Sequence, residues 1–221
     1  MNVLVLGLYA EGPTDNRFLP VVIQRTSELV LAQYDCTDIE ALEPIVIKKD
    51  PGISSRGECI LQAAREAAEY HALIVHSDAD NRTYKQALIE LFNPGYELVQ
   101  RMEGNLCKDL LPIIPVRMVE AWMLADHETL REILRASLAT RDLGLHDKPR
   151  QVELYQDPKE ALKQAVQKIY PNRPRRWSRI MGELYAELAP EISLERLSEV
   201  PAYQQFKADL IATLKKLNFI H

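Results

Sequence analysis

VLVLGLYAEGPTDN, residues 3–16, is the stretch that decides the fold. Residues 3–10 form a continuous apolar run, which is typical of a central parallel strand covered on both faces. Apolar residues then recur at helical spacing from Phe18 onward, and Thr14 is placed to cap that helix. A strand that leads directly into a helix predicts the first unit of an α/β sheet, with Glu11 at the carboxyl end of the strand.

The same alternation continues along the first half of the chain. Further strands are predicted at residues 44–48, 72–75 and 110–116, and helices at 57–70 and 84–91. This order favours a largely parallel sheet built through right-handed crossovers.

After Glu120 the pattern becomes almost wholly helical. Segment 141–155 is polar and its apolar residues recur with no clear period, so it is predicted to be a linker or flap. We expect an α/β domain with a Rossmann-type sheet at residues 1–140 and a helical extension packed on it at 141–221. The predicted helices of the second half are 121–125, 128–138, 158–169, 179–188 and 203–217.

Composition narrows the class of protein. The 221 residues are 47% hydrophobic and 27% charged, as in an ordinary globular protein, so disordered and fibrous classes are excluded. No stretch reaches the roughly 18 apolar residues of a spanning helix, and the N-terminus lacks the pattern of a secretory signal. Three scattered cysteines without a CxxC pair argue against a disulfide framework and a zinc site. We expect a cytoplasmic protein with no membrane partner, and the sequence leaves its oligomeric state open.

Charge is unevenly distributed along the chain. The net charge is −5, but residues 1–140 carry 13 Lys and Arg against 21 Asp and Glu, whereas residues 141–221 carry 14 against 11. If a polyanion binds, a metal has to offset the acidic first part while the second part supplies cations.

Three carboxylates follow predicted strands. Glu11 ends the first strand, and the motif HSDAD, residues 76–80, places Asp78 and Asp80 after a later one. Open α/β sheets bind ligands at this edge, and carboxylates gathered there favour Mg²⁺ or Mn²⁺. On spacing alone the alternative is ordinary turn and capping chemistry, for which Asp is common.

The order E-G-x-T after a first strand and D-x-D after a later one resembles the Toprim domain of topoisomerases, primases and overcoming-lysogenization-defect nucleases. The resemblance implies that Glu11 is an acid/base or metal ligand and that Asp78 and Asp80 hold divalent metal during phosphodiester chemistry. Asp15 stands where the family usually has glutamate and keeps an acidic role open. His76 stands where an apolar or acidic residue is usual and is placed to reach the site, although strand-end histidines are more often surface or capping groups.

The second half resembles one branch, an uncharacterised prokaryotic Toprim-like family (domain of unknown function 4276). The resemblance rests on IPVRMVEAWMLAD at 114–126, KPRQVE at 148–153, DPK at 157–159 and ERLSEVPAYQQFKADL at 195–210. It implies that Glu120 faces the metal site and that a separately encoded ATPase partner in a defence or DNA-processing system is involved. Trp122 is expected in the core, and Asp126 as the N-cap of the next helix.

Lys159 is a candidate catalytic residue. Asp157 and Pro158 fit the N-cap and first position of a helix, so Lys159 projects from the first turn, where the helix dipole disfavours a cation. A lysine beside acidic metal ligands can neutralise the attacked phosphate.

One dense basic run follows. Arginines pair with phosphates, and a tryptophan among them can stack on a base, so the run is a candidate nucleic-acid-binding patch. A solvated loop, a protein contact, or an indole packed in the helical layer are the alternatives. The residues are Arg173, Arg175, Arg176, Trp177 and Arg179.

The motifs of P-loop ATPases, dinucleotide-binding proteins and α/β-hydrolases are absent. The sequence therefore predicts a divalent-metal-dependent nuclease acting on DNA or RNA. Two alternatives remain: a non-catalytic Toprim-like subunit, and a metal-dependent phosphatase or phosphotransferase acting on a small molecule.

Overall fold

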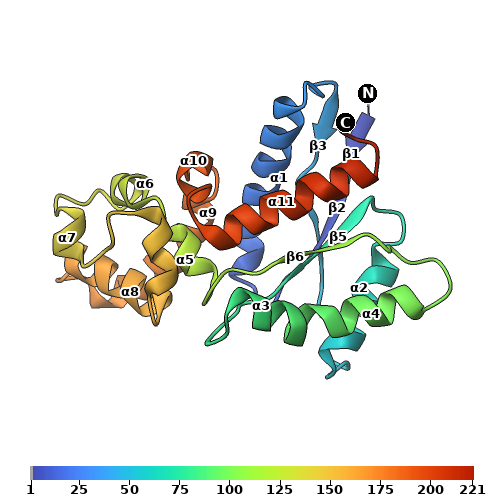
Figure 1. Cartoon of the computed structure of the whole chain (residues 1–221). Coiled ribbons are helices and arrows are strands. Elements are labelled where there is room, and N and C mark those ends of the chain that lie inside the picture. The colour runs from blue at the N-terminus through green and yellow to red at the C-terminus, as the bar shows by residue number, and fades with distance from the viewer. Residues whose placement is uncertain (1) are drawn as a thin grey trace.

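A four-stranded parallel sheet forms the centre of the molecule (Figure 1). The computed structural model describes residues 2–221. The strand order is β4–β2–β5–β6, and β1 and β3 form a separate pair; every pairing is parallel. This confirms the predicted α/β class with a Rossmann-type sheet. The strands are β1 Asn2–Leu4, β2 Leu6–Tyr9, β3 Ile39–Ala41, β4 Ile45–Ile47, β5 Ala72–His76 and β6 Leu110–Ile113.

The predicted first strand is interrupted at Val5. Its backbone N–H donates to Nδ1 of His71 at 3.0 Å rather than to a neighbouring strand. The run therefore divides into β1 and β2, which pair with different partners. Strand β3, which pairs only with β1, was not predicted.

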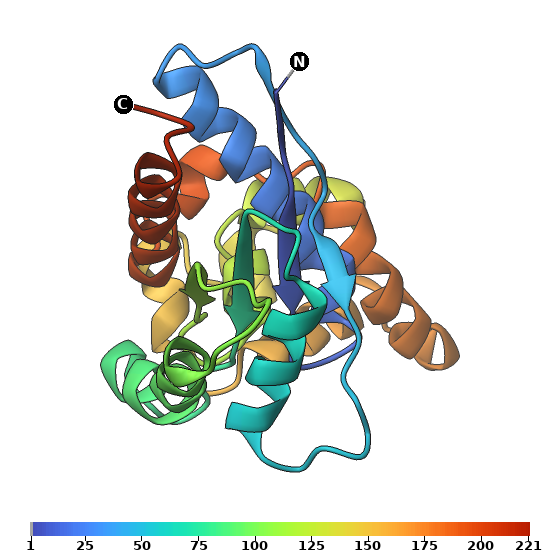
Figure 2. The same cartoon turned by 90° about the vertical axis from the view of Figure 1, so that its right-hand side faces the viewer.

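Helices cover both faces of the sheet. In β5, Ala72 and Ile74 point into one core with α1 (Asp15–Gln33) and α11 (Pro201–Lys216). Leu73 and Val75 point into the other, with α2 (Arg56–Glu66) and α4 (Asn93–Arg101). Both chain termini lie at the same end of the sheet, where β1 begins (Figure 2). The opposite end carries the candidate site.

The predicted helix at 84–91 is only partly regular. It consists of α3 (Tyr84–Ala87), a π-helical turn η1 (Leu88–Phe92) and then α4. Such turns occur frequently at functional sites.

The second half is helical, as predicted, with three corrections. The helix predicted at 128–138 ends at Ile133. The helix predicted at 179–188 begins at Pro174, so the basic run lies within its first turns. Segment 141–155 is not a structureless linker, since it contains α7 and a 3₁₀ helix. The elements are α5 Val119–Met123, α6 His127–Ile133, α7 Thr140–Leu143, η2 Pro149–Leu154, α8 Pro158–Ile169, α9 Pro174–Leu188 and α10 Leu194–Leu197.

The predicted N-caps differ in outcome. Asp126 accepts the N–H of Thr129 at 3.2 Å, and Asp157 accepts that of Glu160 at 2.8 Å, so both are confirmed. The prediction for Thr14 was wrong, because its side chain makes no cap bond and its backbone is already helical.

Trp122 links the helices of the second half to the sheet. Its side chain is fully buried, as predicted, and its ring lies edge-on to Tyr203 of α11 at a centroid distance of 5.3 Å. The same core continues from the first strands to Ile220. None of the helices in residues 2–221 has the length and apolar character that crossing a membrane requires. The domain boundary at residue 140 stays a prediction.

Candidate functional site

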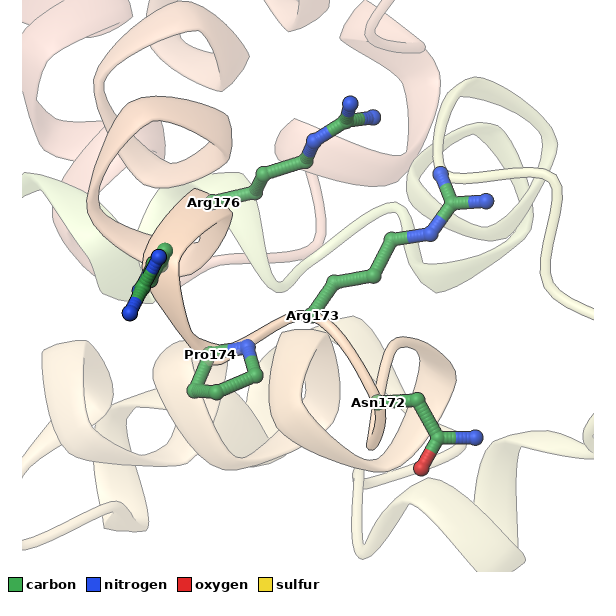
Figure 3. Close-up of a pocket in the computed structure, with 5 residues that line it drawn as sticks. Asn172, Arg173, Pro174 and Arg176 are labelled. Carbon is green, nitrogen blue, oxygen red and sulfur yellow. The ribbon is translucent and has the colours of Figure 1, made fainter.

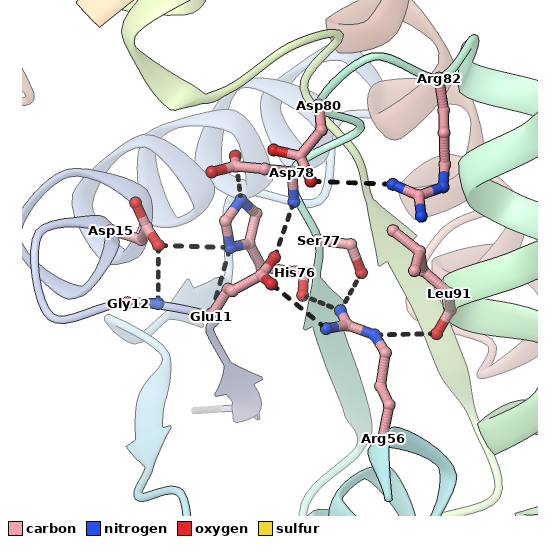
Figure 4. Close-up of polar contacts among 10 residues, drawn as sticks. All are labelled: Glu11, Gly12, Asp15, Arg56, His76, Ser77, Asp78, Asp80, Arg82 and Leu91. Atoms are coloured by element: carbon pink, nitrogen blue, oxygen red, sulfur yellow. Dashed lines mark hydrogen bonds and ion pairs between the residues drawn. The ribbon is translucent and has the colours of Figure 1, made fainter.

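Glu11 and Asp78 meet at the carboxyl edge of the sheet. Glu11 follows β2, and Asp78 follows β5, its neighbour in the sheet. The backbone N–H of Asp78 donates to Oε2 of Glu11 at 3.1 Å (Figure 4). The Glu11 side chain is 45% exposed and that of Asp78 24%. The carboxylates are held at adjacent strand ends and remain accessible to a ligand.

Asp80 is positioned by a left-handed turn. Its φ is 51° and that of Arg117 is 70°. The backbone N–H of Asp80 donates to the carbonyl of Arg117 at 2.9 Å, and the side-chain Nη1 of Arg117 donates to the carbonyl of Asp80 at 3.1 Å. Burial and then the charges of Asp78 and Glu11 raise the pKa of Asp80, while Arg82, 3.7 Å away, lowers it. Asp80 therefore lies within electrostatic reach of both other carboxylates.

His76 is fully buried beneath this edge. Its Nδ1 accepts the Glu11 N–H at 3.3 Å, and its Nε2 lies 3.2 Å from Oδ1 of Asp78. The ring thus fixes the position of Glu11 and the orientation of Asp78. His76 is therefore neither a surface nor a capping residue, the usual roles of histidines at strand ends.

Asp15, the first residue of α1, completes the edge. It accepts the Gly12 N–H at 2.8 Å, and its Oδ2 lies 3.6 Å from Nδ1 of His76. Burial raises its pKa to about 6; His76 opposes the shift, and the charges of Asp78 and Glu120 add to it. We name Glu11, Asp15, Asp78 and Asp80 the sheet-edge cluster.

Sequence reasoning missed Arg56. Its Nη1 lies 3.6 Å from Oε1 of Glu11, while Nη2 donates to the carbonyl of His76 at 2.9 Å and to the hydroxyl of Ser77. Its Nε donates to the carbonyl of Leu91 in the π-helical turn at 3.0 Å. Arg56 is the first residue of α2, where the dipole disfavours a cation. That mismatch, the argument used for Lys159, is the signal that could have found it.

Glu120 faces the sheet-edge cluster from α5. It is buried, with 4% of its surface exposed, and its Oε1 accepts the hydroxyl of Tyr185 and lies 3.6 Å from Nζ of Lys159. Burial and then the charge of Glu120 raise the pKa of Tyr185, and Asp15 and Asp78 add to the shift. Glu120, Lys159 and Tyr185 therefore form a second wall, which we name the helical wall, within electrostatic reach of the sheet edge.

The predicted basic run begins the helix that carries Tyr185. Figure 3 shows Arg173 and Arg176 extending to the same side. Together with Arg179 they line a hollow of about 410 Å³, where Arg179 is paired with Glu183 at 2.8 Å. Trp177, in contrast, lines a different hollow with Lys159. The run therefore presents two faces rather than one patch, and its role in nucleic-acid binding stays a prediction.

The arrangement fits an open site for a hard cation. Among residues 2–221, no three His, Cys, Asp or Glu side chains are grouped so as to hold a metal ion by themselves. Mg²⁺, however, is usually bound by one or two carboxylates, with water and substrate phosphates completing its shell. Asp78 with Asp80 or Glu11 supplies such oxygen ligands. Burial and then the neighbouring charges of Asp78 and Glu11 raise the pKa of Asp80, and a cation would offset those charges.

Comparison with known proteins assigns neither a family nor a function to this chain. No family model, no curated protein and no solved structure matches this chain. The Toprim relationship therefore stays a prediction that rests on the sequence motifs.

Proposed function

We propose that this protein is a divalent-metal-dependent nuclease of Toprim type. The observation that carries the proposal is the convergence of Glu11, Asp78 and Asp80 at the carboxyl edge of a parallel sheet, opposite the buried Glu120 and its partner Lys159. Acidic groups that repel one another beside an exposed cation are suited to a metal and a phosphodiester together.

Each residue has a role in this mechanism. Asp78 and Asp80 hold the metal, and Glu11 binds it or carries a proton at its carboxylate. His76 orients Asp78, and Arg56 orients Glu11, through the contacts described above. Bound Mg²⁺ or Mn²⁺ would supply Lewis-acid polarisation of the phosphate and lower the pKa of the attacking water.

The helical wall acts on the substrate. Lys159, 58% exposed, offsets charge on the attacked phosphate. Glu120, which accepts the hydroxyl of Tyr185, holds the ammonium group of Lys159 in place. The arginines of α9 contact the nucleic-acid backbone further along. The proposal includes a cytoplasmic location. It also includes a separately encoded ATPase partner, because the sequence contains no P-loop motif.

A cleavage assay tests the function. The purified protein is incubated with plasmid, single-stranded DNA and RNA, each with Mg²⁺ or Mn²⁺, with and without the candidate ATPase. The wild type should cut at least one substrate, and Asp78→Ala/Asp80→Ala should not. A control variant, Asp38→Ala/Asp142→Ala, changes two exposed aspartates outside the site and should cut normally. Cleavage that survives in the Asp78/Asp80 variant would overturn the site assignment.

One rival function has a specific observation in its favour. The lack of a complete three-group metal site among residues 2–221 suits a non-catalytic subunit whose basic helix docks a partner protein. No cleavage of any substrate, with metal bound and the ATPase supplied, would favour that rival.

A further inference from the structure

A hollow between α8 and α9 lies beside the helical wall. Its volume is about 340 Å³. Helix α8 supplies two lysines one turn apart, and α9 supplies an indole, a thioether and a hydroxyl. The lining residues are Lys159, Lys163, Pro174, Trp177, Ser178 and Met181.

Trp177 gives this hollow a fixed aromatic wall. The side chain is half-buried, and its Nε1 donates to the carbonyl of Tyr170 at 2.9 Å, which sets the plane of the ring. Met181 follows one turn later on the same helix and lines the same hollow. A held indole beside a flexible thioether is suited to stacking on a flat, apolar ring.

The lysines give the hollow a charged rim. Lys163 is 49% exposed and pairs with Glu160 at 2.9 Å, on the surface of α8. The Nζ of Lys159, which lines the same hollow, lies 3.6 Å from Oε1 of Glu120. A phosphate bound between the two ammonium groups would therefore lie next to the helical wall.

Size decides which nucleic acid fits. A hollow of about 340 Å³ is at the lower end of the range for small-ligand pockets, so it accommodates one nucleotide and no base pair. Proteins that bind single strands combine such stacking aromatics with cations along the backbone. Residues Arg173, Arg176 and Arg179, on another face of α9, line a separate hollow, in which the hydroxyl of Tyr170 donates to the carbonyl of Leu134 at 2.6 Å.

We propose that this hollow binds one unpaired nucleotide of a single-stranded substrate. The base stacks on Trp177 beside Met181, and its phosphate lies between Lys159 and Lys163, which directs the adjoining phosphodiester toward Glu120. The inference rests on the proposed nuclease function and adds a strand preference to it.

Binding measured in EDTA separates this inference from cleavage. The probe is a 12-nucleotide single strand, compared with the same sequence as a duplex and with a mononucleotide, at low salt. The single strand should quench tryptophan fluorescence and bind at least tenfold more tightly than either competitor. Loss of a stacking aromatic lowers affinity about tenfold, so Trp177→Ala should bind correspondingly more weakly and lose the quenching.

Further variants keep the test decisive. Trp177→Phe retains an aromatic ring and should retain most of the affinity, and circular dichroism checks that each variant folds. Lys163→Ala should weaken binding several-fold. The control is Lys215→Ala, which should not weaken it, because Lys215 lies in the last turn of α11 and its Nζ lies over the ring of Tyr34. Equal affinity for duplex and single strand, tight mononucleotide binding, no quenching by any strand, or an unchanged Trp177→Ala variant would overturn the inference. Single-strand binding without cleavage in Mg²⁺ or Mn²⁺, with the candidate ATPase supplied, would overturn only the nuclease function.

Discussion

The sheet-edge cluster and the helical wall are built in different ways. At the sheet edge, side chains bond to the backbone of neighbouring strand ends, as Asp78 and Glu11 do, and to the buried ring of His76. In the helical wall, Glu120 contacts side chains from two other helices, Lys159 and Tyr185. In the proposed mechanism, strand ends hold the groups that would bind metal, while separate helices bring in the groups that would bind substrate. Variants in the two regions should therefore fail differently.

The largest effect is expected at the sheet edge. Asp78→Asn keeps the size of the side chain but removes a charge that the metal needs, so cleavage should fall about a thousandfold or more. Single-turnover rates at saturating Mg²⁺ measure it. Asp38→Asn, at an exposed position, is the matched control. A rate within tenfold of wild type would remove Asp78 from the metal site.

Asp15 should make the sheet edge sensitive to pH. Its pKa is about 6 in the folded protein against 3.8 for an ordinary aspartate, so the folded state holds the proton more tightly. The contribution of the protonated Asp15 to the free energy of unfolding is therefore fully present below about pH 4 and is lost as pH rises past 6. In urea unfolding, the stability of wild type relative to Asp15→Asn should fall by up to about 3 kcal/mol between pH 4 and pH 7. A constant difference would contradict this.

Substitutions in the helical wall should lower the cleavage rate less than substitutions at the sheet edge. Lys159→Ala removes one cation from the attacked phosphate, and loss of one such group costs about a hundredfold in rate. Lys159→Arg should recover part of the activity, and Lys215→Ala should have no effect. If Lys159→Ala lowered the rate as much as Asp78→Asn, the two regions would not differ in the way described.

The smallest effect is expected for a single hydroxyl. Tyr185→Phe leaves the buried Glu120 without its donor, and a hydrogen bond to a charged group contributes about 2 kcal/mol to the free energy of unfolding. Tyr203→Phe is the matched control, because its hydroxyl contacts the neutral Thr26 at 2.8 Å and should cost about 1 kcal/mol. Urea denaturation of both variants gives the comparison. Equal losses would contradict the stronger contribution expected of the Tyr185–Glu120 hydrogen bond.

The sequence predicted the sheet edge better than the helical wall, for a physical reason. Apolar strand runs place Glu11 and Asp78 at adjacent strand ends, so their meeting follows from local pattern and parallel pairing. The break at Val5 was missed because it depends on His71, 66 residues away. Contacts between residues so far apart in the chain leave no pattern in the local sequence.

The helical wall depends on such distant contacts. Lys159 and Glu120 were singled out, but Tyr185 was not, because it joins Glu120 across 65 residues and looks like any core tyrosine in its helix. The density of arginines predicted one basic patch, and the helix after it was predicted to begin at residue 179. The helix begins at Pro174, and helical rotation separates Trp177 from the arginine face.

The most direct test of the account is metal binding at the sheet edge. Electron paramagnetic resonance of Mn²⁺ added to the wild-type protein and to Asp78→Asn/Asp80→Asn measures free metal without requiring a substrate. The account predicts saturable Mn²⁺ binding by the wild type, competed by Mg²⁺ and lost in the double variant while its circular dichroism spectrum is unchanged. Equal binding by both proteins, or none by the wild type, would contradict it.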